Sequence, residues 1–198
     1  YLSAIEDIEG DYLEFGVYTG SSFCHSIRCY KKSRDLSGKV KSETRFIGFD
    51  SFEGFGDLKE EDKHSFYIDE NFSINFLDVD KRVKRISKGV EYKLVQGFFE
   101  NSLKNGPDSY NISKSKIIFI DSDTYSSASE ALLFCSKTIQ EGTFIILDDY
   151  YSYKGSRNKG VARAFYELIE QNQLDVRKIF NYGMGGSVFV VSDIQKKL

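Results

Sequence analysis

Short apolar runs and amphipathic stretches alternate along this chain from one end to the other. Four β-favouring apolar residues in a row, as at 117–120 and 144–147, are typical of strands buried on both faces of a parallel sheet. Between such runs, apolar residues recur at intervals of three or four and predict helices. The alternation predicts an α/β protein with a parallel sheet and helices on both faces.

Seven segments have the pattern of strands. The first five follow the strand–helix alternation, whereas the last two flank the glycine-rich turn 183–186, which favours an antiparallel hairpin. The predicted strands are 12–17, 45–49, 92–95, 117–120, 144–147, 176–180 and 187–191. We therefore expect a seven-stranded, mostly parallel sheet that ends in a hairpin.

The helical stretches are also distinct. Ser21 and Ser22 can begin a helix, and later apolar spacings predict helices over about 76–86, 127–140 and 161–169. Residues 51–75 are rich in charge, glycine and phenylalanine, and they predict a long functional loop. With no repeat or linker in the pattern, we expect a single domain over residues 1–198.

Composition excludes several classes of protein. The 27 basic and 30 acidic residues give a net charge of −3 and are interleaved, so a nucleic-acid binder is not expected. No apolar run reaches the length of a membrane span, and no signal-peptide pattern opens the chain. The three cysteines form no C-x-x-C pair, which disfavours a disulfide framework or zinc site and favours the cytoplasm.

Carboxylates gather where two predicted strands end. Asp121 and Asp123 follow the strand 117–120, and Asp148 and Asp149 follow the strand 144–147. Neighbouring strand ends lie about 4.8 Å apart, and ligands of parallel sheets bind at the carboxyl ends of the strands. Converging carboxylates repel one another unless a cation such as Mg²⁺ or Ca²⁺ lies between them. The alternative is that these side chains cap strand ends or pair with lysines.

The turn after the first strand has the features of a nucleoside site. Gly16 and Gly20 let the backbone approach a ligand, and the next helix presents free N–H groups there. Asp50 ends the second strand, where a carboxylate can bind ribose hydroxyls. The turn lacks a tight G-x-G, which disfavours a pyrophosphate. A phosphate-free nucleoside such as S-adenosylmethionine fits better, because Glu14 adds a negative charge near its cationic groups.

Five ordered motifs resemble a known family, the macrocin-type O-methyltransferases, which methylate macrolide sugars. The motifs are Leu13-Glu14-Phe15-Gly16-Val17-Tyr18-Thr19-Gly20, Gly48-Phe49-Asp50-Ser51-Phe52-Glu53-Gly54, Gly97-Phe98-Phe99-Glu100-Asn101-Ser102-Leu103, Ile120-Asp121-Ser122-Asp123-Thr124-Tyr125-Ser126-Ser127 and Asp148-Asp149-Tyr150. They span roughly residues 12–165. One stretch departs from the family: residues 151–160 make a longer path into the next helix.

The resemblance implies a Rossmann-like class I methyltransferase fold, S-adenosylmethionine as methyl donor, Mg²⁺ as cofactor, and a hydroxyl of a sugar or other small molecule as acceptor. It also implies a homodimer. The residues implied to bind S-adenosylmethionine are Glu14, Gly16, Val17, Tyr18, Thr19, Gly20, Ser22, Asp50, Ser51, Gly97, Phe98, Asp121 and Ser122. The residues implied to bind the metal are Asp121, Asp148 and Asp149.

In this interpretation Asp121 is both a metal ligand and the general base of methyl transfer. A carboxylate already bound to a metal is a poor base, so a water molecule or Asp123 is the alternative. Tyr150, Tyr151 and Tyr153 can stack on an acceptor or simply pack in the core.

Two other functions compete with methyl transfer. Asp121-Ser122-Asp123 matches the D-x-D of metal-dependent glycosyltransferases, although that motif is short. A non-catalytic S-adenosylmethionine-binding subunit is the second competitor. His25 and His64 are expected to be solvated, and Cys24 and Cys135 to pack within helices.

Overall fold

The computed structural model describes residues 2–37, 43–65, 67 and 72–195, with the backbone alone at 35–37. Its sheet has seven strands in the order β3-β2-β1-β4-β5-β7-β6. The strands are β1 (Asp11–Phe15), β2 (Phe46–Asp50), β3 (Tyr92–Gln96), β4 (Ser115–Ile120), β5 (Phe144–Leu147), β6 (Leu174–Tyr182) and β7 (Gly186–Ile194). The first five are parallel, and β7 pairs antiparallel with both β5 and β6. The predicted sheet and hairpin are confirmed.

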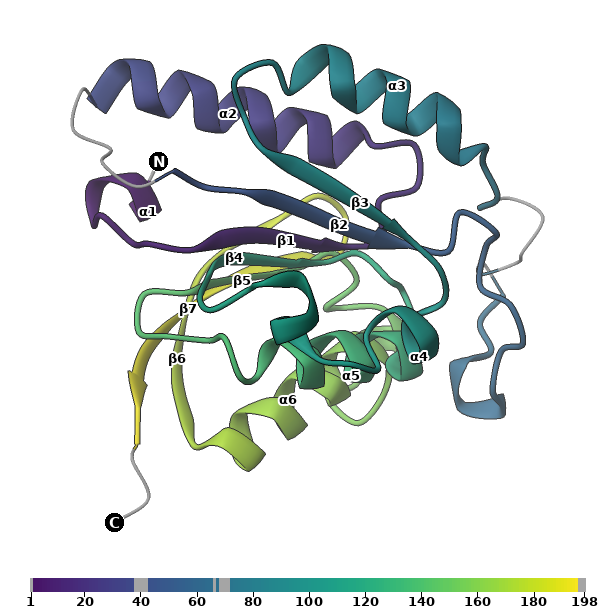
Figure 1. Cartoon of the computed structure of the whole chain (residues 1–198). Helices are drawn as coiled ribbons and strands as arrows, with labels where there is room; N and C mark the ends of the chain where they lie inside the picture. Colours follow the sequence, from purple (N-terminus) through teal and green to yellow (C-terminus); the bar gives the residue numbers. More distant parts are fainter. Residues whose placement is uncertain (1, 38–42, 66, 68–71, 196–198) are drawn as a thin grey trace.

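Helices cover both faces of the sheet (Figure 1). One face carries α2 (Ser21–Ser37) and α3 (Phe76–Ile86), and the other carries α4 (Phe99–Ser102), α5 (Tyr125–Cys135) and α6 (Gly160–Asn172). Shorter helices that the sequence pattern did not predict are α1 (Leu2–Ile5), η1 (Glu60–Asp62), η3 (Pro107–Tyr110) and η4 (Tyr153–Gly155). Among the described residues, no helix combines the length and apolarity needed to cross a membrane.

The core lies on both sides of β1, which is buried along its whole length. Successive side chains of a strand point to opposite faces. Phe15 stacks on Phe49 at 5.0 Å between ring centroids and belongs to the cluster beneath α5 and α6. Tyr12 packs instead against Phe23 of α2 and Phe46 of β2. The runs 117–120 of β4 and 144–147 of β5 are apolar without interruption because helices cover both faces of the sheet.

The predicted bounds of one helix were wrong: α5 covers Tyr125–Cys135, not 127–140. Its first residue follows Thr124, whose hydroxyl accepts the Ser127 N–H. Beyond Cys135 the chain turns, and the Thr138 hydroxyl is 2.7 Å from the Ser115 hydroxyl at the start of β4. This contact with a distant strand takes the chain out of the helix.

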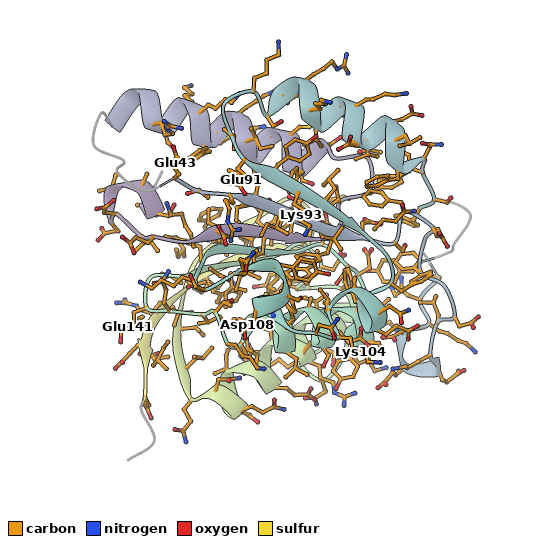
Figure 2. The ribbon with its side chains drawn as sticks, in the orientation of Figure 1. Glu43, Glu91, Lys93, Lys104, Asp108 and Glu141 are labelled. Atoms are coloured by element: carbon orange, nitrogen blue, oxygen red, sulfur yellow. The ribbon has the colours of Figure 1, made fainter. Side chains whose placement is uncertain are left out.

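Charged residues of both signs surround the edge strand β3 (Figure 2). Glu91 and Lys93 flank Tyr92, and both are exposed. Charges on an edge strand discourage pairing with another chain.

The predicted loop between β2 and α3 lies beside the carboxyl ends of the strands (Figure 1). Its residues 66 and 68–71 lie outside the described residues. Asp62 fixes the described part, because its carboxylate accepts the Ser126 N–H at 3.1 Å and its carbonyl accepts the Tyr153 hydroxyl at 3.0 Å. An ion pair of 2.9 Å between Glu61 and Arg163 adds a contact with α6.

Candidate active site

A cavity of about 340 Å³ opens at the carboxyl ends of β1, β2, β4 and β5. It contains five carboxylates and four phenylalanine rings, so it offers both charged and apolar walls. The lining residues are Gly16, Tyr18, Asp50, Ser51, Gly54, Phe55, Phe72, Phe98, Phe99, Asp121, Ser122, Asp123, Ser127, Asp148, Asp149 and Met184. This is the edge of the sheet at which ligands of parallel α/β proteins bind.

Gly16 allows the ends of β1 and β4 to approach each other. Its φ is +95°, and a Cβ atom there would lie 1.8 Å from the Asp121 carbonyl oxygen. The Asp121 N–H donates to the Phe15 carbonyl at 2.8 Å on the same side. Only glycine fits, so the turn predicted to approach a ligand also packs directly against the aspartate cluster.

Two backbone amides orient Asp50. The Tyr18 N–H donates to Oδ2 at 2.7 Å, and the Phe52 N–H donates to Oδ1 at 2.6 Å. Burial raises the pKa of Asp50 despite these donors, which favour the charged form. Both oxygens retain lone pairs, so the carboxylate can also accept from ribose hydroxyls in the cavity.

Glu14 lies beneath the turn and does not line the cavity. Its side chain is completely buried, with one oxygen accepting the Tyr12 hydroxyl and the other the Ser22 hydroxyl, the latter at 2.6 Å. Burial raises the pKa of Glu14 to about 8. Its contacts with Tyr12 and Ser22 support the turn from below.

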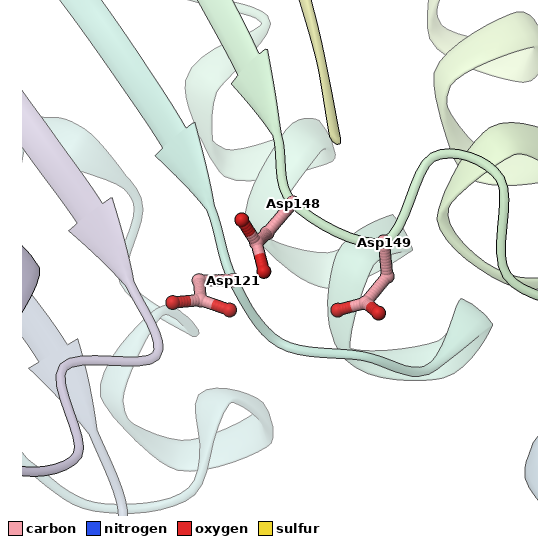
Figure 3. A group of neighbouring side chains, drawn as sticks. All are labelled: Asp121, Asp148 and Asp149. Carbon is pink, nitrogen blue, oxygen red and sulfur yellow. The ribbon is translucent and has the colours of Figure 1, made fainter. Parts of the chain in front are cut away.

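The three aspartates predicted to bind a metal converge (Figure 3). Each offers a carboxylate oxygen, and these oxygens lie within 4.8 Å of one another. Burial, followed by the charges of Asp148 and Glu14, raises the pKa of Asp121 to about 8. Burial also raises the pKa of Asp148. Such mutual repulsion is what a divalent cation with oxygen ligands relieves.

Further groups hold Asp149 in place. Its Oδ1 accepts the Ser152 hydroxyl at 2.9 Å and the Tyr67 hydroxyl at 3.1 Å. Asp123 shares a hydrogen bond with Asp149, and burial with the Asp149 charge holds the pKa of Asp123 well above its usual range. The His64 ring lies 4.6 Å from the Tyr67 ring. His64 is thus half-buried rather than solvated as predicted, whereas His25 is exposed.

The structure brings many of the predicted residues together, but not all. Those that line the cavity are Gly16, Tyr18, Asp50, Ser51, Phe98, Asp121, Ser122, Asp148 and Asp149. Those that do not are Glu14, Val17, Thr19, Gly20, Ser22 and Gly97. Cys24 and Cys135 are fully buried within helices, as predicted.

Sequence reasoning missed several cavity residues, chiefly Phe55, Phe72 and Met184. The rings of Phe55 and Phe72 pack at 4.9 Å and form one wall. The abundance of phenylalanine in residues 51–75 was the available signal. Met184, fully exposed at the tip of the hairpin, had none.

The chemistry of the cavity fits a nucleoside ligand and a divalent cation. The Ser122 hydroxyl lines it, is buried, and has no hydrogen-bond partner among the described residues. A buried hydroxyl in this state is stabilised by a ligand that supplies a partner. The aromatic wall suits an adenine ring, and the aspartate oxygens suit Mg²⁺.

Comparison with known proteins gives the same picture. The O-methyltransferase NovP superimposes with a TM-score of 0.73 at 19% identity, over 96% of this chain and 77% of that chain. CalS11, a calicheamicin methyltransferase, gives a TM-score of 0.74 at 15% identity, over 97% and 76%. These likenesses establish the fold, which is that of class I methyltransferases. No curated protein matches the sequence.

The family model of the macrocin O-methyltransferases (TylF) matches residues 3–179. A match over most of the chain displaces the glycosyltransferase and non-catalytic alternatives, and it places Asp121-Ser122-Asp123 within a methyltransferase framework. The chain belongs to the macrocin O-methyltransferase family, and it is a methyltransferase that uses S-adenosylmethionine.

Proposed function

We propose that this enzyme methylates a hydroxyl of a sugar or other small molecule, with Mg²⁺ held by Asp121, Asp148 and Asp149. The observation that carries the proposal is the convergence of three carboxylates within 4.8 Å at the wall of a cavity suited to a nucleoside. One structural neighbour supports a sugar acceptor: CalS11 is described as a TDP-rhamnose 3'-O-methyltransferase.

Different residues of the cavity wall bind different parts of the nucleoside in this proposal. Asp50 is placed to accept the ribose hydroxyls, and Ser122 to hydrogen-bond the nucleoside. Phe98 and Phe99 offer apolar contact to the adenine. Glu14 acts from below by fixing Ser22 and therefore the start of α2, a change from the direct contact first expected.

The reaction forms a bond between the acceptor oxygen and the methyl carbon while the carbon–sulfur bond breaks and its electron pair stays on sulfur. The hydroxyl proton must pass to a base. A bound divalent cation supplies positive charge that lowers the pKa of an acceptor hydroxyl. The protein mainly aligns the two reactants, which is worth about 7–11 kcal/mol in favourable cases.

Asp123 is better placed than Asp121 to accept that proton. It lines the cavity but stands outside the metal cluster, so its lone pairs are not committed to a cation. Asp121 then serves as a ligand.

The test combines metal binding with methyl transfer. Mn²⁺ or Mg²⁺ titration should show one site in the wild type that Asp148→Ala and Asp149→Ala remove. Transfer from labelled S-adenosylmethionine to TDP-rhamnose or a catechol should fall by about a hundredfold or more. Binding of S-adenosylhomocysteine should survive, because the ribose is assigned to Asp50 and not to either of these residues.

Asp175→Ala is the matched control, since Asp175 is an exposed acid on β6, remote from the cavity. It should leave metal binding and transfer unchanged. Full activity of either site variant in EDTA would contradict the metal role. Failure to bind S-adenosylhomocysteine would contradict the cofactor assignment.

A further inference from the structure

A second cavity, of about 360 Å³, is lined in part by Tyr150 and Tyr151, which directly follow Asp149 in the chain. It is enclosed by α6, by the hairpin of β6 and β7, and by the loop 151–160. The sequence predicted that this loop is longer than the corresponding path in the family. We call this space the tyrosine cavity, after Tyr150, Tyr151 and Tyr166 in its walls.

The walls of the tyrosine cavity are aromatic and held in place. The hydroxyls of Tyr150 and Tyr166 are 2.7 Å apart and hydrogen-bonded. The Tyr150 ring meets the Tyr151 ring edge-on at 4.9 Å and the Phe189 ring at 5.2 Å. Tyr150 and Phe189 are buried in the main core. The floor is therefore rigid and apolar, with hydroxyl groups at its side.

Two cations lie at the rim. The Arg157 guanidinium is 5.2 Å from the centre of the Tyr166 ring, and the Lys178 ammonium is 5.1 Å from that of Tyr151. Lys178 also donates to the Tyr151 hydroxyl. Within the described part of the chain, neither cation forms an ion pair with a carboxylate.

Charge separates the tyrosine cavity from the active site. Among the residues that the structure describes, five aspartates and no basic residue line the active site, whereas two basic residues and no acidic one line the tyrosine cavity. The active site therefore favours a cationic ligand, and the tyrosine cavity favours an anionic one. Arg157 and Lys178 are both exposed, and within the described residues neither has a carboxylate partner, so an anionic group of a ligand can pair with both.

We propose that the tyrosine cavity binds a small organic anion with a planar apolar body, of the class of aryl carboxylates and aryl phosphates. The ring of such a ligand packs on the tyrosine and phenylalanine walls, and its anionic group lies between Arg157 and Lys178. The site is distinct from the S-adenosylmethionine site and does not depend on the metal. Tyr150, in the wall of the tyrosine cavity, directly follows Asp149 of the active site in the chain.

Ligand-observed NMR and calorimetry in EDTA, with benzoate and phenyl phosphate as probes and benzamide as the neutral analogue, test the proposal. Both anions should bind saturably and benzamide at least tenfold more weakly. The double variant Arg157→Gln/Lys178→Gln should weaken the anions at least tenfold. Excess S-adenosylhomocysteine should not displace them.

The matched control is Lys154→Gln/Lys159→Gln, which removes the same charge from exposed positions of the same loop that do not line the cavity. It should bind like the wild type. The proposal is overturned if neither anion binds saturably, if benzamide binds as well as benzoate, or if the control double variant loses as much affinity as the first. Displacement by S-adenosylhomocysteine would also overturn it.

Discussion

At the scale of single residues, the most informative contact is the one between Tyr67 and Asp149. Tyr67 comes from the loop between β2 and α3, and its side chain is 4% exposed. Its hydroxyl is 3.1 Å from both Asp149 Oδ1 and Ser152 Oγ. Groups that hydrogen-bond a metal ligand fix its orientation and tune its affinity. Tyr67 is therefore a positioning residue for the proposed metal site.

Tyr67→Phe should lower the affinity for Mg²⁺ about tenfold, at the lower end of the range for such outer partners. The hydroxyl is lost while the ring stays, so packing against His64 is kept. Isothermal titration with Mg²⁺ and with S-adenosylhomocysteine measures the two affinities separately. Only the affinity for Mg²⁺ should change.

Tyr92→Phe serves as the control, because that hydroxyl donates to Asp80 on α3, away from the cavity. An unchanged Mg²⁺ affinity in Tyr67→Phe would show that Ser152 alone holds Asp149. A wild type without a Mg²⁺ site would instead refute the metal proposal itself.

Residues at the ends of strands could be predicted from the sequence as part of the site, whereas residues of the long loop could not. Asp121 and Asp148 could be predicted because each directly follows an apolar strand, and strand ends in a parallel sheet share one edge. Tyr67 and Phe72 could not, because a loop residue reaches the cavity through contacts set by the whole fold. Glu14 was predicted at the right strand end, but its side chain points to the face covered by α2, where it contacts Ser22, and it does not line the cavity.

At the scale of elements, the ends of β1 and β4 approach each other closely at Gly16. Gly16→Ala places a Cβ atom 1.8 Å from the Asp121 carbonyl, so the backbone must move. We expect a loss of more than about 3 kcal/mol in the free energy of unfolding, together with weaker cofactor binding. Urea unfolding followed by circular dichroism measures the loss.

Gly89→Ala is the matched comparison. Its φ is also positive, at +76°, but nothing lies within 4 Å of the added Cβ. In that variant only the backbone strain of an alanine at positive φ should lower the free energy of unfolding, by about 1–2 kcal/mol. Equal losses in the two variants would show that the close approach at Gly16 contributes nothing beyond its backbone angle.

Helices could be predicted where the apolar spacing continued for several turns, but the residues at which they end could not. α3 and α6 follow the apolar spacing that predicted them. The early end of α5 depends on a hydroxyl contact between Thr138 and Ser115, residues far apart in the sequence. α4 is only four residues long, too short for any period to appear.

At the scale of the whole molecule, the strand order decides where the chemistry lies. β1 is central and pairs with both β2 and β4, so the turns after these strands, together with that after β5, face one cavity. The apolar pattern predicts individual strands, but it does not predict the order of the strands in the sheet. Here the motif order supplied it, since the family resemblance implied the class I fold.

The same burial that builds the site makes the stability of the free protein depend on pH. The pKa of Glu14 is raised from about 4.5 to about 8 in the folded state. The folded protein therefore binds this proton more tightly than the unfolded chain does. By linkage, the free energy of unfolding falls as pH rises from about 4.5 to 8, by up to about 1.4 kcal/mol per pH unit.

Glu14→Gln should reduce that slope, because the amide keeps hydrogen bonds with Tyr12 and Ser22 but does not ionise. Urea unfolding at pH 5, 6, 7 and 8, in EDTA and without cofactor, gives the slope directly. Glu170→Gln, at an exposed position of α6, should keep the wild-type slope. If Glu14→Gln keeps it as well, the buried carboxyl is not the group that titrates. If the slope falls, the enzyme carries a protonated acid beneath its cofactor turn at neutral pH, and the slope that remains belongs to other groups with raised pKa values, such as Asp121.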